Sequence, residues 1–200
     1  MKNNRTADES IYNDEKYHAS PKEYFKLLND KIYEINGQKK GITLLDVGCA
    51  NGALLNFIEA KNPSFKLIGL EPVLSLIKLG ETLNPNIKFI NKGLHEVKEE
   101  DMIKADFVLC AGVIGIFNNP KLVIKKLFKS LNPGGAILIF SPFNEEDVDV
   151  ILKYKYSGGK NWETGHNLFS MRTMEIIAFE NKLTVDWVDF KMPISIEKTK

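Results

Sequence analysis

A run of small residues after an acidic residue is the part of the sequence whose types and spacing best predict chemistry. Residues 44–52 read LLDVGCANG. Asp46 closes an apolar run there, and small residues follow it at every second position. Such a passage from strand to helix lets the backbone approach a ligand closely. The segment therefore predicts a ligand-binding turn, although an ordinary strand–helix turn of another doubly wound protein stays open as the alternative.

A second carboxylate stands at the end of the next apolar segment. Glu71 follows residues 66–70, about 20 residues after the turn. At this distance a carboxylate can accept hydrogen bonds from both hydroxyls of a ribose. An acid at a strand end is usually just solvated, but its pairing with the turn favours a nucleoside-containing ligand.

The elements that must position these residues follow an alternating pattern. Apolar runs of strand length alternate with segments of helical period, which predicts a parallel sheet covered by helices on both faces. The expected strands are 42–47, 66–70, 87–90, 106–110 and 136–140. One helix is expected directly after the turn at 44–52, and two more at 73–83 and 122–131. A second turn is expected at 133–135.

The segments that flank this core also carry patterns. An amphipathic helix is expected at 21–35. After the core, 144–154 and 172–181 have a helical pattern, and 184–190 has that of a strand. The polar, glycine-containing stretch 156–167 is predicted to be a loop that binds substrate.

Four motifs in order resemble the class I S-adenosylmethionine-dependent methyltransferases. They are the DxGxGxG-like turn at 44–52, the acid Glu71, the segment 106–120 and the LxPGG-like residues 131–135. The resemblance covers roughly residues 41–142. It implies an α/β, Rossmann-like, three-layer αβα sandwich with a mostly parallel sheet of six to seven strands, in the order 3-2-1-4-5-(7)-6.

The same resemblance implies S-adenosyl-L-methionine as the cofactor and assigns its contacts. Asp46 would orient the amino-acid end, the turn would cradle the methionine part, and Glu71 would clamp the ribose. Adenine would lie near Gly93 and Leu94, with recognition left to backbone groups and to Asn91 or Lys92. The implied cofactor residues are Asp46, Gly48, Cys49, Ala50, Asn51, Gly52, Glu71, Pro72, Gly93, Leu94, Ala111, Gly112 and Val113. Ala50 replaces the usual middle glycine.

The acceptor side is less clear from the sequence. No NPPY or DPPY tetrapeptide follows the fourth strand, which disfavours methylation of DNA adenine or protein glutamine. Ile116 occupies the place where many small-molecule relatives carry a histidine. His166 is the candidate general base, with a purely structural contact to a loop carbonyl as an equal alternative. Trp162 is a candidate substrate residue beside it.

An aromatic N-terminal segment resembles the mobile lid of relatives. Tyr17 and His18 are candidate lid residues that could exclude water from methyl transfer, and a frayed terminus is the alternative. We expect residues 1–36 to form a helical lid or cap and residues 37–200 to form the cofactor-binding domain. Only residues 194–200 remain for a seventh strand, so the sheet ends short or the C-terminus is truncated.

Composition narrows the class of partner. The net charge is +1 from 27 basic and 26 acidic residues, so neither nucleic acid nor a membrane is expected to attract the chain. No apolar leader is evident, which predicts a cytoplasmic protein. The strand order that the resemblance implies would bring Cys49 and Cys110 to the same end of the sheet, where we expect thiols. No metal site is expected from the scattered histidines.

The function predicted from these features is transfer of a methyl group to an oxygen or nitrogen of a small polar or sugar-like acceptor. A catalytically inactive, S-adenosylmethionine-binding regulatory protein or subunit is the alternative, motivated by the missing histidine and the missing adenine acid. A Rossmann oxidoreductase is disfavoured by the acid before the glycines. The sequence leaves a homodimer open.

Overall fold

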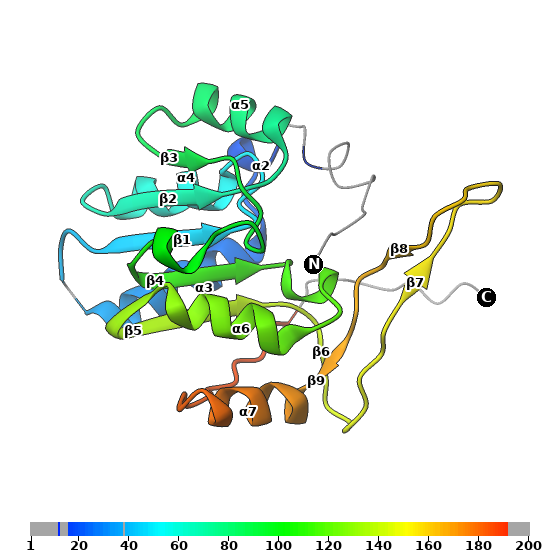
Figure 1. Ribbon diagram of the computed structural model, residues 1–200. Coiled ribbons are helices and arrows are strands. Elements are labelled where there is room, and N and C mark those ends of the chain that lie inside the picture. The colour runs from blue at the N-terminus through cyan, green and yellow to red at the C-terminus, as the bar shows by residue number, and fades with distance from the viewer. Residues whose placement is uncertain (1–11, 13–15, 38, 192–200) are drawn as a thin grey trace, which may run out of the picture.

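A parallel sheet of five strands carries the rest of the structure (Figure 1). The computed structural model describes residues 12, 16–37 and 39–191. The strands are β1 (Thr43–Val47), β2 (Lys66–Leu70), β3 (Lys88–Ile90), β4 (Ala105–Ala111) and β5 (Leu131–Phe140). Their order is β3-β2-β1-β4-β5, and every neighbouring pair is parallel. The Rossmann-like fold and the order 3-2-1-4-5 are confirmed, whereas a sixth or seventh strand of this sheet is absent from the described residues.

Helices cover both faces of the sheet and make the three predicted layers (Figure 1). Helices α3 (Glu23–Asn36) and α4 (Ala53–Lys61) lie on one face, and α6 (Pro120–Lys129) and α7 (Met171–Glu180) lie on the other. Helix α5 (Leu74–Leu83) packs against β3, and α2 (Lys16–Ala19), η1 (Glu99–Asp101) and η2 (Ile114–Ile116) are short. None of the described helices is both long and apolar enough to cross a membrane.

The two layers of core follow from the alternation of side chains along each strand. Leu44 packs with α3 and α4, whereas its neighbour Leu45 packs with α6 and α7. Both leucines are almost fully buried, and burial of such a side chain contributes about 2 kcal/mol. The expected apolar strands without polar alternation are therefore explained by helices on both sides. Phe25 and Leu28 of α3 are buried in the core that α4 also contacts. The predicted division of the chain at residue 37 stays a prediction.

The expected turn at 133–135 lies inside a strand. Strand β5 begins at Leu131, which pairs with Ala105, and regular pairing resumes at Ala136 opposite Phe107. The extra residues form a bulge in which Gly134 has a φ of 77°, a conformation that glycine adopts without strain. The LxPGG-like residues thus form a bulge within β5 and not a turn before it.

The predicted helix at 144–154 is wrong, because side chains there bind backbone groups outside a helix. Asn144 accepts from the Glu146 N–H and donates to the Val148 carbonyl, at 3.2 and 2.8 Å. Asp149 accepts from the Ser170 N–H at 2.7 Å, beside the start of α7. The segment instead forms β6 (Phe143–Asn144) and β7 (Lys153–Tyr154).

The predicted strand at 184–190 is also wrong. This segment has no regular secondary structure and is held by side chains. Trp187 contacts the Phe143 ring at 5.2 Å and donates to Glu175 at 3.0 Å, and Phe190 contacts Phe140 at 5.2 Å. Aromatic anchors therefore replace backbone pairing at this edge.

Two small sheets extend the fold beyond β5. Strand β6 pairs in parallel with β9 (Phe169–Ser170), and β7 pairs antiparallel with β8 (Glu163–Thr164). We call residues 150–166, which contain β7 and β8, the arm. Figure 1 shows the arm leaving the body on the side where the parallel strands end. The predicted loop at 156–167 is thus mostly the outer half of a hairpin.

Candidate active site

A cavity of about 530 Å³ opens at the carboxyl ends of the parallel strands. Ligand pockets of 300–1,000 Å³ are usual, and in open α/β sheets they lie at this edge. Walls come from the turn after β1, the end of β2, the loops after β3 and β4, the segment before α3, and the arm. This cavity is therefore the place where the predicted site residues should lie.

The turn after β1 forms the floor. The N–H of Gly48 donates to the Leu70 carbonyl at 2.7 Å, which ties the turn to the end of β2. Gly48 has a φ of 75°, and a Cβ there would lie 2.5 Å from the side chain of Val113. Ala50 has a φ of 50°, a left-handed conformation that glycine adopts more easily than alanine. This explains why the motif usually has glycine at this position.

Glu71 lines the cavity at the end of β2. It is 6% exposed, and it accepts hydrogen bonds from the N–H groups of Ala50 at 3.1 Å and Val73 at 3.0 Å. Asn91 donates to the Glu71 and Pro72 carbonyls at 3.0 and 2.9 Å, which fixes the backbone beside it. The carboxylate is thereby held at the place where a ribose clamp is expected.

Asp46 stands beside Glu71 at the end of the adjacent strand. It is 3% exposed, and burial together with the neighbouring Glu71 raises its pKa to about 7. A cation placed nearby would favour the charged form of this carboxyl. The ammonium group at the methionine end of S-adenosylmethionine is such a cation, so the acidic pair fits the predicted cofactor.

The loop after β3 is fixed by charged side chains from outside. Lys126 of α6 donates to the carbonyls of Leu94, His95 and Val97 at 2.8, 3.1 and 2.9 Å. The Gly93 N–H donates to Glu96 at 2.6 Å. Gly93, Leu94 and His95 line the cavity, so this loop is the candidate adenine wall.

Two predicted adenine contacts lie elsewhere. Asn91 is used by the backbone beside Glu71, and Lys92 lies 3.8 Å from Asp101. Neither is among the residues that line the cavity. Of the groups predicted to recognise adenine, the backbone of the loop at Gly93 and Leu94 is the part that lies at the cavity.

Aromatic residues before and within α3 cover another side. The Lys22 ammonium lies 5.1, 4.1 and 5.8 Å from the ring centres of Tyr12, Tyr17 and Tyr24. Burial and the nearby Lys16 lower the pKa of Lys22. Lys22 and these tyrosines line the cavity, so they bring a positive charge and three rings to it.

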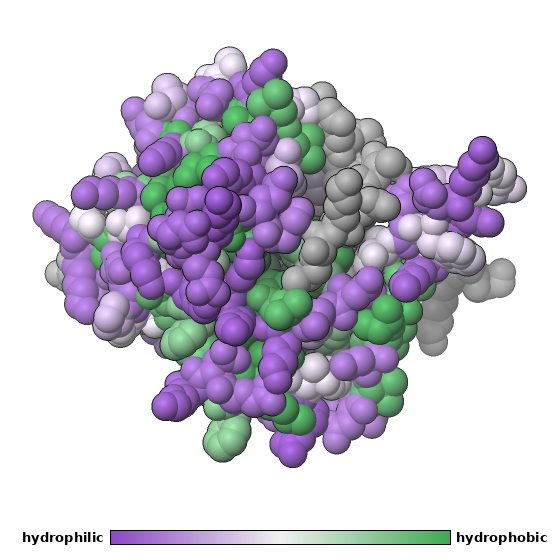
Figure 2. Space-filling view, in the orientation of Figure 1, coloured by the Kyte–Doolittle hydropathy of each residue, from purple (hydrophilic) through white to green (hydrophobic). Residues whose placement is uncertain are grey.

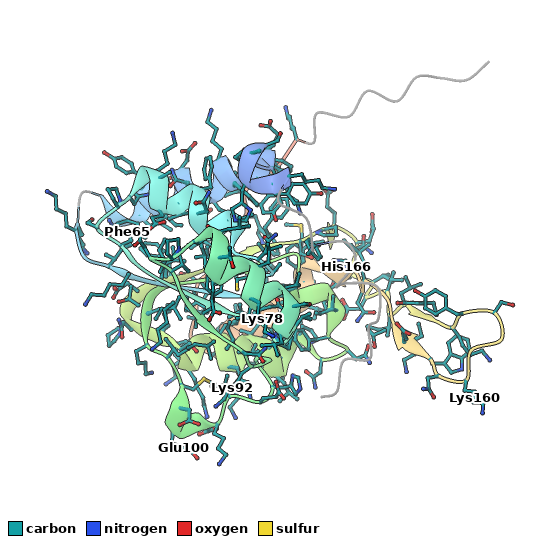
Figure 3. All side chains as sticks on the ribbon, turned by 90° about the horizontal axis from the view of Figure 1, so that it is seen from above. Phe65, Lys78, Lys92, Glu100, Lys160 and His166 are labelled. Atoms are coloured by element: carbon teal, nitrogen blue, oxygen red, sulfur yellow. The ribbon has the colours of Figure 1, made fainter. Side chains whose placement is uncertain are left out.

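His166 enters the cavity from the arm. Its Nε2 lies 3.4 Å from the Ser141 hydroxyl, and a Cβ on Gly115 would lie 2.5 Å from the same nitrogen. Ile116 and Phe117 line the cavity nearby. Figure 3 shows His166 at the inner end of the arm. The imidazole is thus part of the cavity wall that the arm contributes.

The structure brings most of the predicted site residues together. All the predicted cofactor residues except Gly52 line the cavity, as do Tyr17 and His166. Gly52 precedes α4 and packs against Phe89. His18 lies 3.3 Å from Asn84 behind the cofactor turn, and Trp162 lies on the arm, 62% exposed.

The two cysteines lie at the predicted end of the sheet but on opposite faces. Cys49 packs in the cluster with α3 and α4, and Cys110 packs in the cluster with α6 and α7. Both are free and buried. Burial and Asp46 raise the pKa of Cys110 to about 12, and raise that of Cys49 as well. No group of three or more candidate metal ligands occurs among the described residues.

Several lining residues escaped prediction. They are Lys22, Tyr24, Val73, Leu76, His95, Phe117 and Phe140. Tyr24 stacks on Phe140 at 4.2 Å, and burial and Asp46 raise its pKa. Lys22 and Tyr24 lie at the start of the helix expected at 21–35, within the segment expected to form a lid, but the sequence alone did not assign either residue to the cavity.

Fold and site together define a Rossmann-like domain that binds S-adenosylmethionine. The methyltransferase domain family matches residues 19–185, and the chain belongs to this family. Over 185 residues it is 28% identical to the tRNA U34 carboxymethyltransferase of Campylobacter lari, covering 82% of this chain and 62% of that protein. It is 26% identical over 164 residues to the mitochondrial ubiquinone biosynthesis O-methyltransferase of Rattus norvegicus, covering 74% and 46%.

Solved structures share the fold. An amino pentose methyltransferase from Micromonospora echinaspora, solved with S-adenosylmethionine bound, superposes with a TM-score of 0.63 at 14% identity, covering 85% of this chain and 87% of that one. DesVI of Streptomyces venezuelae gives 0.62 at 13% identity, covering 90% and 89%. The chain spans about half to three-fifths of the length of the two curated sequence relatives above.

Proposed function

We propose that the chain transfers the methyl group of S-adenosylmethionine to an oxygen or nitrogen of a small, polar or sugar-like acceptor group. The observation that carries the proposal is the pair Asp46 and Glu71, two buried carboxylates at the ends of adjacent strands that face one cavity. A ligand with an ammonium group and a ribose matches that pair in charge and hydrogen bonding.

The proposed roles follow the walls of the cavity. Asp46 binds the ammonium group, Glu71 accepts from the ribose hydroxyls, and the loop at Gly93 holds adenine. Lys22 supplies a positive charge for the carboxylate at the methionine end of the cofactor. When bound, the cofactor supplies an electrophilic methyl group, so the protein's main task is to align the acceptor with it.

His166 is the proposed general base for a hydroxyl acceptor. It faces the cavity from the arm, and the Ser141 hydroxyl at 3.4 Å can orient the ring. Tyr17 covers the cavity from the N-terminal side, which supports its proposed role in excluding water. Cytoplasmic location, a lid formed by residues 1–36 and a homodimer stay predictions.

Two observations bear on the acceptor. One structural neighbour is an amino pentose methyltransferase, which supports a sugar-like acceptor group. Sequence relatives are tRNA U34 carboxymethyltransferases, which supports an acceptor group presented within a nucleic acid. In both cases the group that enters the cavity is small and polar, and the low net charge disfavours only attraction of nucleic acid to the whole surface.

The test is transfer of a radiolabelled methyl group from S-adenosylmethionine to a panel of amino sugars, hydroxylated metabolites and short RNAs. We expect label in at least one acceptor, and much less label with the His166→Gln protein. A folded protein that binds S-adenosylhomocysteine yet labels no acceptor class would favour the alternative, an inactive cofactor-binding protein.

A further inference from the structure

The arm carries an organised group of aromatic side chains outside the cavity. The Tyr154 and Tyr156 rings meet edge to face at 5.7 Å, and the Lys155 ammonium lies 5.6 Å from the centre of the Trp162 ring. The Tyr154 hydroxyl donates to the buried Glu163 at 2.8 Å, which braces the hairpin. Tyr156 and Trp162 nevertheless expose 55% and 62% of their surface. The two rings are therefore held by neighbouring side chains and still expose more than half of their surface.

The charge on this part of the arm is of one sign. Residues 150–162 contain Lys153, Lys155 and Lys160 and no acidic residue, whereas the whole chain has a net charge of only +1. An acidic run at 145–149 precedes the arm at its foot, where Asp149 binds Ser170 at the start of α7. The outer arm is thus a basic region with interleaved aromatic residues.

The arm is tied to the candidate active site at its inner end. The Gly165 N–H donates to the Leu152 carbonyl at 2.8 Å, and the Asn167 N–H donates to the Gly115 carbonyl at 2.7 Å. His166 lies between these two anchors and lines the cavity. Figure 3 shows Lys160 at the outer tip of the arm and His166 at its base. A molecule bound along the arm would therefore reach the cavity at His166.

We propose that the arm binds a single-stranded nucleic acid and presents one of its nucleotides to the cavity at His166. The inference rests on the proposed function and names its acceptor class. Lysines bind the phosphates of a single strand, and exposed aromatic rings stack on its bases with little sequence preference. Lysines and aromatic residues alternate along this hairpin, as phosphates and bases do along a single strand.

A membrane surface fits this arm less well. Insertion into a lipid interface relies on Leu, Phe and Trp side chains, and Trp162 is the one residue of this kind within 155–162. Residues 155–162 read KYSGGKNW and contain no aliphatic residue larger than glycine, whereas the exposed Val150, Ile151 and Leu152 lie at the foot. Figure 2 shows the outer arm as hydrophilic to neutral, with green patches nearer the body. The distribution favours nucleic acid.

The test measures binding of the full chain to a fluorescein-labelled single-stranded RNA of about 12 nucleotides by fluorescence anisotropy. We expect the Kd of Trp162→Ala to rise roughly 5- to 150-fold, since loss of one stacked base costs about 1–3 kcal/mol. Trp162→Phe keeps an aromatic face, so it should retain most of the affinity. Because Trp162 is largely exposed, neither change should unfold the protein.

The lysines are tested by salt dependence. Each phosphate contact contributes a slope of about −0.7 to the dependence of log K on log salt concentration for a single strand. The Lys155→Gln, Lys160→Gln double variant should therefore have a slope shallower by about 1.4. Lys66→Gln makes the same kind of charge change at the exposed start of β2 and should leave the slope of wild type unchanged. Figure 3 shows the adjacent Phe65 far from Lys160.

S-adenosylhomocysteine binding, measured in parallel by calorimetry, separates the two proposals. The arm proposal would be overturned if wild type bound S-adenosylhomocysteine but not RNA. It would also be overturned if the arm variants bound RNA as well as wild type does. Either result would leave the proposed function standing. Binding to vesicles of phosphatidylglycerol and phosphatidylcholine without RNA binding would overturn it in favour of a membrane. A folded wild type that fails to bind S-adenosylhomocysteine would overturn the proposed function, and with it delivery to His166.

Discussion

The two sides of the cavity are built from different kinds of structure. On the cofactor side, Asp46 and Glu71 are buried at the ends of central parallel strands and held by neighbouring backbone. On the acceptor side, His166 is exposed and follows β8, a strand of two residues. Positions on the first side are set by the sheet, and those on the second by a few loop contacts. Cofactor binding and acceptor choice should therefore respond separately to mutation.

The largest expected effect lies on the acceptor side. His166→Gln should lower kcat for a hydroxyl acceptor by roughly 10²- to 10⁴-fold, the usual contribution of a general base. Affinity for S-adenosylhomocysteine should stay within about twofold of wild type, because the cofactor side is untouched. Steady-state kinetics and calorimetry on the same preparations check both. An equal loss of cofactor affinity would break the separation of the two sides.

The buried carboxyl of Asp46 gives a pH-dependent effect on stability. Its pKa is raised from 3.8 to about 7, so between these values the unfolded chain loses the proton while the folded chain keeps it. Stability must therefore fall as pH rises through this window. Asp46→Asn should remove the loss and exceed wild type at pH 8 by up to roughly 4 kcal/mol, with the difference vanishing near pH 4.

Urea unfolding at several pH values measures the Asp46 effect. Asp30→Asn, an exposed change on α3, controls for loss of a carboxylate and should follow the pH profile of wild type. If Asp46→Asn were less stable than wild type at pH 8, the carboxylate would be stabilising the fold, contrary to the burial of the acidic pair.

A smaller effect should come from outside the cavity. Lys126→Met leaves three loop carbonyls without their donor, which should cost about 1–2 kcal/mol of unfolding free energy and weaken S-adenosylhomocysteine binding by roughly 5- to 20-fold. Lys125→Met, its exposed neighbour on α6, is the matched control. Unchanged cofactor affinity in Lys126→Met would show that the loop holds its shape without the lysine.

The walls that we propose hold the cofactor were predictable from the sequence because their signals are local. The turn at 44–52, Glu71 and the alternating elements each depend on residues close together in the chain, and a parallel sheet brings their ends to one edge. Even the bulge in β5 falls within the predicted LxPGG-like motif.

The acceptor side was less predictable because distant contacts decide it. Residues 144–154 have an apolar content compatible with a helix, yet pairing of Val150 with Leu168 and the bonds of Asp149 to the start of α7 impose an extended path. Alternation of lysine and tyrosine at 153–156 was the one strand signal there. Lys22 reaches the cavity only because α3 packs on the sheet.

The most direct test of the cofactor site is calorimetric titration of wild type and Glu71→Ala with S-adenosylhomocysteine, with the exposed Glu81→Ala on α5 as control. Loss of two charge-assisted hydrogen bonds to the ribose predicts a Kd at least roughly 50-fold weaker for Glu71→Ala and unchanged for Glu81→Ala. Equal affinity in all three proteins, or no binding by folded wild type, would contradict the assignment of this cavity to S-adenosylmethionine.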